Sequence, residues 1–413
     1  MMPFKRNGTV AVAVLLLWLL GCRLASSILP TTPTPLIYVD TFFSGHSFVD
    51  SNHNGELDPT DAPLENARFT VGAFGATTDE SGYAFVIIPG DWAEPVTARM
   101  LPPQGSSYTL IGPAQVILQS GGQTSADFLF TTQENPSGSP SGKPKPGSVE
   151  IDLTYCTTAD GEDLKMDIYY PGRMDKPSPA VVYVHGGGWI AGDKTEGAGL
   201  LFAPLLQKQG YLVAAINYRL APADPFPAPI EDVKCAIRHL RVNADRYHLA
   251  PDRIGVVGGS AGGHLAALLG LADASAGWDS GQYGEYSSRV KAVVDLFGPA
   301  DLTQLFTPQR QAGAKEIFGV SGPDDPLLRN YSPVTYITPD DPPFLILQGL
   351  EDKTVPPSQS QLLYERLSGA GVTAHLVMIK NAGHGFQPVG GQPDPSIQRL
   401  ALMVLEFFDR YLK

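Results

Sequence analysis

The sequence predicts an α/β domain, a mostly parallel sheet with helices on both faces, preceded by a small all-β sandwich. From residue 148 to the C-terminus, apolar strand-like runs alternate with helical stretches, whereas residues 36–131 contain only short strand-like runs. Residues 132–147 contain no large apolar side chain and cannot join a core, so they form a linker between two domains. Two folded units also agree with a length of 413 residues.

The strand-like runs of the first domain are separated by Gly, Pro and Asp turns. They lie at 67–74, 83–88, 96–101, 114–118 and 125–130. In the second domain, a hairpin of 149–155 and 164–170 precedes strands at 181–184, 212–217, 254–258, 290–297, 344–348 and 374–379. Helices are predicted at 228–243, 359–369 and 396–412, and the last has a helical apolar stripe that packs on the sheet: Leu400, Met403, Val404, Phe407, Phe408 and Tyr411.

Charge excludes one class of partner. The chain has 42 acidic against 29 basic side chains, a net charge of -13, and no basic cluster that could bind a phosphate backbone, so nucleic acid is not an expected ligand. The two cysteines beyond the N-terminal region, Cys156 and Cys235, could form one disulfide or remain two buried thiols, because sequence separation does not report proximity.

The N-terminal residues follow an export pattern. Lys5 and Arg6 precede eleven apolar residues, 10–20, which are too few to span a bilayer, since about 20 are needed. The sequence Leu19-Leu20-Gly21-Cys22 resembles a bacterial lipobox, which implies cleavage before Cys22 and a lipid anchor on that residue; residues 23–35 would then be a tether. The alternative is an ordinary secretory signal cut near Ala25. Both interpretations place the mature protein outside the cytoplasm.

Loop 50–61 of the first domain has the spacing of a calcium loop. Oxygen-bearing side chains stand at its positions 1, 3, 5, 9 and 12 and glycine at position 6. Together with 76–90, the segment resembles the calcium-binding B-type repeats of bacterial surface adhesins. The alternative is a solvated turn without metal. The candidate ligands of this structural Ca²⁺ are Asp50, Asn52, Asn54, Glu56 and Asp61.

Ser260 is the candidate nucleophile. It is the centre of the sequence Gly-Gly-Ser-Ala-Gly at 258–262, which follows an apolar strand and opens a helical run. Glycines two residues before and after the serine permit the tight strand-to-helix turn that exposes its hydroxyl. The motif alone is weak evidence for a nucleophile in a chain with 44 glycines, so the assignment depends on whether partner residues are also present.

A glycine loop upstream supplies the expected oxyanion hole. His185 is followed by three glycines and Trp189, directly after a predicted strand. Backbone N–H groups aimed at one point stabilise the negative oxygen that forms in acyl transfer. We expect these donors to be Gly187, Gly188 and Ala261, and His185 to hold the loop by hydrogen bonds.

The acid and the base are expected beyond the serine, in the order nucleophile, acid, histidine. His384 lies in a glycine-flanked loop after a strand, whereas His375 lies inside that strand, so His384 is the expected base. Asp352 follows another strand and would orient the imidazole, with Glu351 as the neighbouring rival. Asp301 is interpreted as a helix cap or a lid contact. Catalysis by these residues needs no cofactor.

Five ordered motifs carry a family resemblance that extends from about 148 to the C-terminus. HGGGW, NYRLAP, GGSAGGH, the G-x-x-D-x-x-V-P of 349–356 and GHGF resemble the esterase and lipase branch of the α/β-hydrolases, and most of all its carbohydrate acetyl and feruloyl esterases. Gly259 departs from the Asp usual in hormone-sensitive-lipase relatives. The resemblance implies a serine carboxylesterase acting on short-chain or carbohydrate-linked esters. A serine peptidase of the same fold and a catalytically inactive surface-binding protein are the alternatives.

Overall fold

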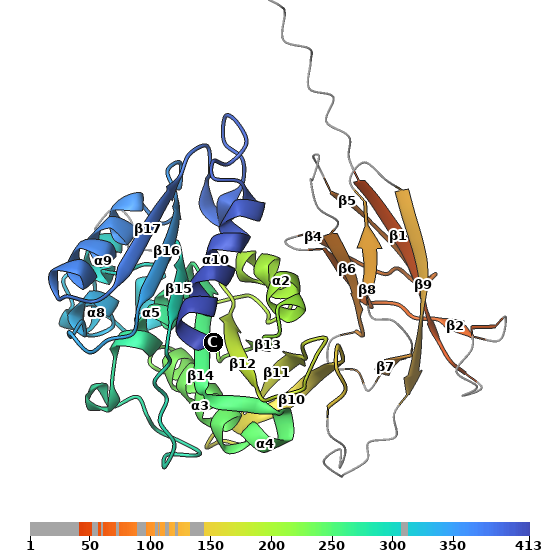
Figure 1. Cartoon of the computed structure of the whole chain (residues 1–413), viewed down its shortest axis with the longest axis horizontal. Coiled ribbons are helices and arrows are strands. Elements are labelled where there is room, and N and C mark those ends of the chain that lie inside the picture. Colours follow the sequence, from red (N-terminus) through yellow and green to blue (C-terminus); the bar gives the residue numbers. More distant parts are fainter. Residues whose placement is uncertain are drawn as a thin grey trace, which may run out of the picture.

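The computed structural model describes two parts of the chain that lie side by side, a β-rich region and a larger α/β region (Figure 1). The described residues are 41–51, 57–58, 61–71, 74–88, 96–103, 106, 108–111, 115–119, 123–132, 144–306 and 313–413.

The β-rich region is a sandwich of two sheets. One sheet has the order β2-β1-β9-β7 with β5 also paired to β1, and the other has the order β4-β3-β6-β8. Phe43, Phe69, Phe128 and Phe130 are buried in the core between the two sheets. The strands are β1 (Thr41–Val49), β2 (Ala62–Pro63), β3 (Arg68–Val71), β4 (Phe74–Thr77), β5 (Tyr83–Ile88), β6 (Val96–Leu101), β7 (Tyr108–Ile111), β8 (Gln115–Leu118) and β9 (Gln123–Thr132).

The sandwich differs from the sequence prediction in several strands. The run expected at 67–74 is two strands, β3 and the start of β4, which pair antiparallel. Strands β1, β2 and β7 were not expected at all. β1 carries Ser44, Gly45, His46 and Ser47 in its centre, which lowers its strand propensity. The glycine is required by packing, because a Cβ on Gly45 would lie 2.3 Å from the carbonyl oxygen of Ala126 on β9.

The α/β region is built on an eight-stranded sheet with the order β10-β11-β13-β12-β14-β15-β16-β17. The first two strands form the expected antiparallel edge hairpin, and the others are parallel. Every strand predicted for this domain is present. They are β10 (Val149–Thr157), β11 (Asp163–Tyr169), β12 (Ser178–Val184), β13 (Leu212–Ile216), β14 (Leu249–Gly259), β15 (Val293–Leu296), β16 (Phe344–Gly349) and β17 (Ala374–Ile379).

Helices cover both faces of this sheet, as the sequence predicts. Successive side chains of a strand point to opposite faces, so Val182 and Val184 of β12 belong to one apolar cluster and Val181 and Tyr183 to another. The first cluster includes α3 (Ala228–Val242), α5 (Ala261–Leu271) and α9 (Pro357–Gly369); the second includes α2 (Ala203–Lys208) and α10 (Ile397–Leu412). The short helices are α4 (Ala244–Tyr247), α6 (Leu302–Leu305), α7 (Ala314–Phe318) and α8 (Pro326–Asn330).

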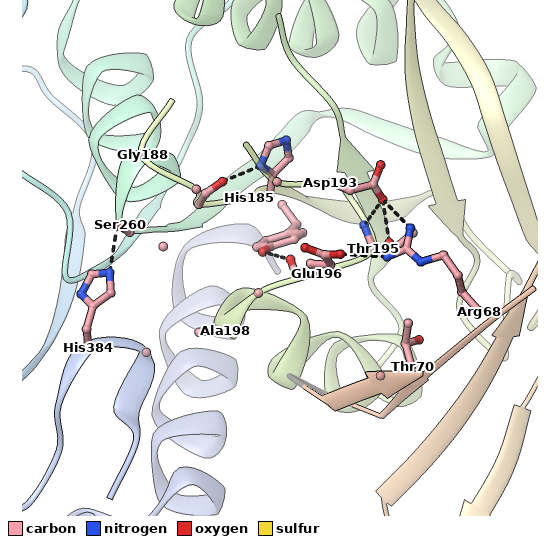
Figure 2. A pocket seen from close by; sticks show the side chains of 18 of the residues that line it. Arg68, Thr70, His185, Gly188, Asp193, Thr195, Glu196, Ala198, Ser260 and His384 are labelled. Atoms are coloured by element: carbon pink, nitrogen blue, oxygen red, sulfur yellow. Dashed lines mark hydrogen bonds and ion pairs between the residues drawn. The ribbon is translucent and has the colours of Figure 1, made fainter. Parts of the chain in front are cut away.

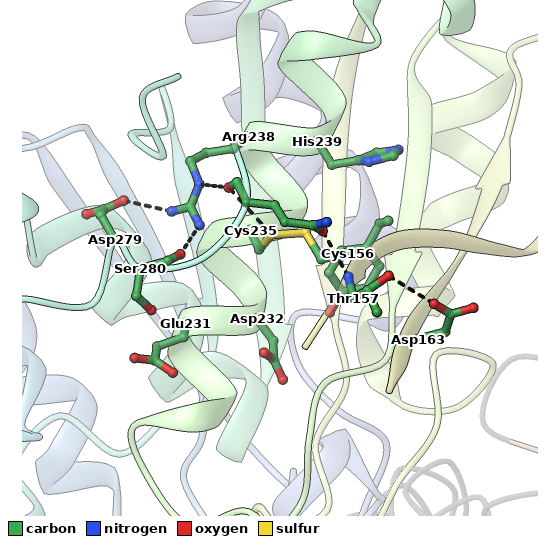
Figure 3. The surroundings of a disulfide bond; sticks show 12 residues. Cys156, Thr157, Asp163, Glu231, Asp232, Cys235, Arg238, His239, Asp279 and Ser280 are labelled. Atoms are coloured by element: carbon green, nitrogen blue, oxygen red, sulfur yellow. Dashed lines mark hydrogen bonds and ion pairs between the residues drawn. A yellow bond between two sulfur atoms is a disulfide. The ribbon is translucent and has the colours of Figure 1, made fainter. Parts of the chain in front are cut away.

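Cys156 and Cys235 form a disulfide (Figure 3), which resolves the alternative that the sequence left open. The bond joins the edge strand β10 to α3 across 79 residues of sequence. Beside it, the Arg238 guanidinium donates to Asp279 at 3.2 Å and to the Gln282 carbonyl at 3.0 Å. The disulfide and these contacts tie the edge of the sheet, a covering helix and the 279–282 loop together.

Several N-terminal expectations fall on residues outside the described part. These are the proposed lipid anchor Cys22, the interdomain residues 133–143, and the calcium-loop residues Asn52, Asn54 and Glu56. At the ends of that loop Asp50 is buried, and Asp61 accepts hydrogen bonds from the backbone N–H groups of Ser51 and Asp58 at 3.0 and 2.9 Å. Within the described residues, no group of three His, Cys, Asp or Glu side chains is placed to hold a metal, and no helix is long and apolar enough to cross a membrane.

Candidate active site

Ser260 lies in a tight turn between β14 and α5. Its backbone has φ 56° and ψ -120°, a left-handed conformation that is strained for a residue with a side chain and that is common at functional sites. The flanking glycines are sterically required: a Cβ on Gly258 would lie 2.1 Å from the Gly262 carbonyl oxygen, and one on Gly262 would lie 2.2 Å from that of Val184. The turn is therefore the elbow that the sequence predicts.

The structure brings the three side chains expected from the sequence into one hydrogen-bonded chain. His384 Nε2 lies 3.0 Å from Ser260 Oγ, and His384 Nδ1 lies 2.8 Å from Asp352 Oδ2. Because the carboxylate can only accept, Nδ1 donates to it and Nε2 is left to accept the serine proton. Ser260 and His384 are 124 residues apart in the sequence. They meet because the parallel strands that precede them end at the same edge of the sheet.

Asp352 is held ionised and in a fixed orientation. Its Oδ1 accepts from the backbone N–H groups of Thr354 at 2.8 Å and Val355 at 3.0 Å. Burial by itself raises the pKa of Asp352, but the hydrogen bond and charge of His384, with those backbone donors, outweigh burial and lower the pKa below its ordinary value. The rival Glu351 has an exposed side chain, so the structure favours Asp352 as the partner of the histidine.

The glycine loop after β12 is oriented by His185. The His185 ring is buried, stacks on Tyr218 with ring centroids 4.3 Å apart, and donates from Nδ1 to the Gly186 carbonyl at 2.7 Å. The Gly187 carbonyl accepts from the N–H of Ala191 at 3.1 Å. In a trans peptide the N–H points opposite to the carbonyl, so these bonds turn the N–H groups of Gly187 and Gly188 to the other side of the loop.

Two further features bear on the predicted oxyanion hole. Gly187 and Gly188 have φ values of 112° and 62°, which L side chains rarely adopt, and both line the same cavity as Ser260. Ala261 is the first residue of α5, and the N–H groups of a first helical turn have no partner within the helix. Burial lowers the pKa of His185, which keeps its ring neutral and suits a structural role.

A second histidine, His264, supports the loop from behind and was not singled out by the sequence. It is fully buried, accepts from Trp189 Nε1 at 3.3 Å through Nδ1 and donates from Nε2 to the Tyr331 carbonyl at 2.8 Å. Burial lowers the pKa of His264 to about 4, so it too is neutral. The signal that could have found it is its place at the end of the GGSAGGH motif, next to the elbow and facing the tryptophan of HGGGW.

The NYRLAP motif has a comparable supporting role. Asn217 donates from Nδ2 to Asp193 at 2.9 Å and accepts from the backbone N–H of Lys194 at 2.6 Å. Tyr218 donates from its hydroxyl to the His185 carbonyl at 3.0 Å. The end of β13 therefore fixes both ends of the loop that follows β12.

The remaining candidates lie outside the hydrogen-bonded chain. His375 is exposed on β17, in agreement with its predicted place on the sheet surface. Asp301 precedes α6 and accepts from the backbone N–H of Thr303 at 3.0 Å, so it is the helix cap that the sequence allowed.

Ser260 opens into a cavity of about 700 Å³ (Figure 2). It is lined by the glycine loop, the elbow, Phe297, His384 and most residues of the 192–198 loop. β3 and β4 of the sandwich, including Arg68 and Thr70, lie across the cavity from Ser260 and His384. A cavity of this size can enclose a ligand of several hundred daltons.

Comparison with known proteins shows similarity to esterases of the α/β-hydrolase fold. The family model BD-FAE matches residues 166–367. A solved carbohydrate esterase from gut microbiota is 27% identical with a TM-score of 0.52, over 65% of this chain and 99% of that chain. The α/β domain has the α/β-hydrolase fold of these esterases and is similar to them in sequence. The fold expected from the motifs is therefore confirmed.

Other esterases show the same similarity. Esterase 2 of the Planctomycetes species Thermogutta terrifontis, solved with butyrate bound, is 27% identical with a TM-score of 0.51, over 64% of this chain and 93% of that chain. Esterase LipC and the probable carboxylic ester hydrolase LipM of Mycobacterium tuberculosis are 32% and 34% identical over 55% and 50% of this chain. The chain spans about half the length of the curated relatives it matches, 58% of LipC and 49% of LipM.

Proposed function

We propose that the chain is a serine carboxylic ester hydrolase that acts through an acyl-enzyme. The observation that carries the proposal is the hydrogen-bonded order Ser260, His384, Asp352, with distances of 3.0 and 2.8 Å, at the floor of an open cavity. The same order of nucleophile, base and orienting acid serves acyl transfer on unrelated folds, because each group meets a requirement of the reaction.

The reaction has two halves. Ser260 Oγ attacks the ester carbonyl carbon and gives its proton to His384 Nε2, and the carbonyl oxygen becomes an oxyanion that accepts from the N–H groups of Gly187, Gly188 and Ala261. Collapse of this intermediate breaks the bond to the alcohol oxygen, which takes the proton from His384. Water then attacks the acyl-enzyme by the same route and releases the acid. Asp352 holds the imidazole and stabilises its charged form.

For the substrate, we propose short-chain or carbohydrate-linked esters, with acetyl and feruloyl groups as the acyl classes to test. Two relatives support this choice: one solved neighbour is a carbohydrate esterase and another binds butyrate, a four-carbon acid. Phe297 and His384, whose ring centroids are 4.8 Å apart, both line the cavity next to Ser260.

The test is hydrolysis of p-nitrophenyl acetate by the wild type and by Ser260→Ala, combined with labelling by an organophosphonate. We expect label and turnover in the wild type only. Equal labelling of both proteins would refute Ser260 as the nucleophile. A panel of p-nitrophenyl esters of increasing chain length, acetylated xylan and methyl ferulate then ranks the acyl classes, and faster cleavage of an amino-acyl nitroanilide would favour the peptidase alternative.

We also propose that the protein is exported and anchored to the membrane by lipid on Cys22. The Cys156–Cys235 disulfide supports export, because disulfides persist in oxidising compartments. Cys22→Ala should move the protein from the membrane fraction to the soluble fraction and abolish incorporation of labelled fatty acid. An unchanged membrane fraction would favour a different anchor.

Calcium in loop 50–61 is a separate structural proposal. It is supported by the oxygen-rich spacing and by the buried carboxylate of Asp50. Added Ca²⁺ should raise the unfolding temperature of the full chain, and Asp50→Asn together with Asp61→Asn should remove that increase. A Ca²⁺ effect that survives both substitutions would place the ion elsewhere.

A further inference from the structure

The sandwich contacts the α/β domain through the outer face of its β4-β3-β6-β8 sheet (Figure 1). On β3, Phe69 and Val71 are buried in the sandwich core, so the alternation of a strand directs Arg68 and Thr70 outward. Arg99 of β6 is directly opposite Thr70 in the ladder and points the same way. The outer face therefore presents two arginines and a threonine to the neighbouring domain.

The two arginines clamp this face onto the α/β domain. Arg68 forms ion pairs with Glu196 at 2.9 Å and Asp193 at 3.7 Å, both on the loop that follows HGGGW. The Arg99 guanidinium donates to Gln207 at 3.3 Å and lies 4.6 Å from the centre of the Tyr169 ring. The Asp193 carboxylate also accepts a hydrogen bond from Asn217, which helps to hold the glycine loop. Asp193 therefore connects the sandwich to the residues that position this loop.

The cavity into which Ser260 opens lies beside the contact made by Arg68. Figure 2 shows Thr70 and Arg68 on one side of it and Ser260 and His384 on the other, with Glu196 and Ala198 between them. The hairpin residues Gly75, Ala76 and Thr77 extend the same wall. The sandwich thus contributes part of the lining of the cavity into which Ser260 opens.

The chemistry of the cavity changes along its length. Near Ser260 its surface is glycine backbone and Phe297, which suits a small acyl group and its carbonyl. Toward the sandwich it is lined by Thr70, Thr77, Arg68 and the exposed Glu196. The Arg68 guanidinium is already paired with Glu196 and Asp193, so this mixture of hydroxyl-bearing and paired charged side chains matches a neutral group with several hydroxyls better than an alkyl chain or an anion.

We propose that β3 and β4 of the sandwich form the substrate site for a hydroxyl-rich glycosyl portion of the ester. Thr70 contacts this portion, and Arg68 is a positioning residue that holds the wall through Glu196 and Asp193. The proposal rests on the esterase function proposed above and adds the source of its substrate preference. The N-terminal domain is then a part of the specificity site rather than a spacer alone.

The test measures selectivity, defined as kcat/KM for an acetylated xylo-oligosaccharide divided by kcat/KM for p-nitrophenyl acetate. Thr70→Trp should lower selectivity about tenfold or more, the size expected when a bulky side chain displaces part of a bound substrate. The matched control is Ile117→Trp, which places the same bulk on β8 of the same sheet, at a side chain that is 66% exposed and does not line the cavity. Its selectivity should equal that of the wild type.

Arg68 is tested by a rescue series. Arg68→Met should raise KM for the oligosaccharide ester several-fold with little change in its kcat, because the wall loses its ion pairs while the reacting groups stay in place. Arg68→Lys should recover part of the loss, and Glu196→Gln combined with Arg68→Met should add little to either single change. The unfolding temperatures of all variants show whether a loss of activity is caused by destabilisation of the fold instead.

The outcomes separate the two proposals. A wild type that cleaves neither ester would refute the esterase function. A wild type that cleaves only p-nitrophenyl acetate, or equal selectivities for Thr70→Trp and Ile117→Trp, would refute the sandwich wall and leave the esterase function intact. A fall in kcat for both esters by the same factor in Arg68→Met would show a general structural effect and would also refute the inference.

Discussion

Asp352→Asn is the substitution that most directly tests the hydrogen-bonded chain at the active site. In the wild type, Oδ1 accepts from two backbone N–H groups at 2.8 and 3.0 Å, whereas the Gln348 amide donates to Oδ2 at a longer 3.3 Å, so we expect the amide oxygen of asparagine to take the Oδ1 place. The amide nitrogen then occupies the position of Oδ2, 2.8 Å from His384 Nδ1, as a donor. The imidazole must present an unprotonated Nδ1 and carry its proton on Nε2.

This tautomer is the wrong one for catalysis. A protonated Nε2, 3.0 Å from Ser260 Oγ, cannot accept the serine proton. We expect kcat on p-nitrophenyl acetate to fall by roughly a thousandfold to ten-thousandfold, about 4 to 5.5 kcal/mol in the barrier, the upper end being the size found when this role is removed from a serine triad. The matched control is Glu351→Gln, one residue away and exposed, which should stay within about twofold.

The assay is steady-state turnover, with unfolding temperature as the control for folding. A loss below about tenfold for Asp352→Asn would mean that the carboxylate does not set the imidazole tautomer. A loss of equal size in Glu351→Gln would move the acid to the neighbouring residue. Either result would refute the reasoning above.

Three further predictions follow from the supporting structure. His185→Phe keeps a ring on Tyr218 but removes the hydrogen bond to Gly186, so kcat on p-nitrophenyl acetate should fall about tenfold to a hundredfold, and an unchanged kcat would contradict the orienting role. Replacing Cys156 and Cys235 by serine should lower the free energy of unfolding by about 4 kcal/mol in denaturant titrations, because the disulfide closes a loop of 79 residues. A change below about 1 kcal/mol would show that the disulfide contributes little to stability. Burial raises the pKa of Asp295 to about 7, so the folded protein keeps a proton that the unfolded chain loses near pH 4, and the free energy of unfolding falls as pH rises between these values. The free energy of unfolding of Asp295→Asn should therefore rise by up to about 4 kcal/mol relative to the wild type between pH 4 and pH 8. Parallel stability profiles of the two proteins would contradict this.

The α/β domain was predictable because its signals are local. Each strand is a continuous apolar run, and the elbow is encoded within five residues around Ser260. His384 and Asp352 were found by chain order and by their place after strands, since parallel strands bring those ends to one edge of the sheet. Local pattern and known chain order together were sufficient to predict that these three side chains meet.

The features that the sequence did not predict depend on distant partners. Arg68 lies 128 residues from Glu196, and nothing in its neighbourhood distinguishes it from another surface arginine on a strand. The pairing of Cys156 with Cys235 likewise needs the position of α3 over β10. Strand β1 was missed because the residues in its centre are polar or glycine, which are not typical of a strand. The glycine is needed because β9 passes close to it, which the sequence alone does not show.

The disulfide also determines how the α/β domain responds to mechanical force. Its sheet begins at β10, an edge strand held by a single neighbour, so a pull from the N-terminal side would peel this strand from β11 beginning at Val149. Cys156 lies near the far end of β10, and its covalent bond transfers the load to α3 in the core. An oxidised domain should therefore stop unravelling at Cys156 under force, whereas a reduced domain would continue into β11.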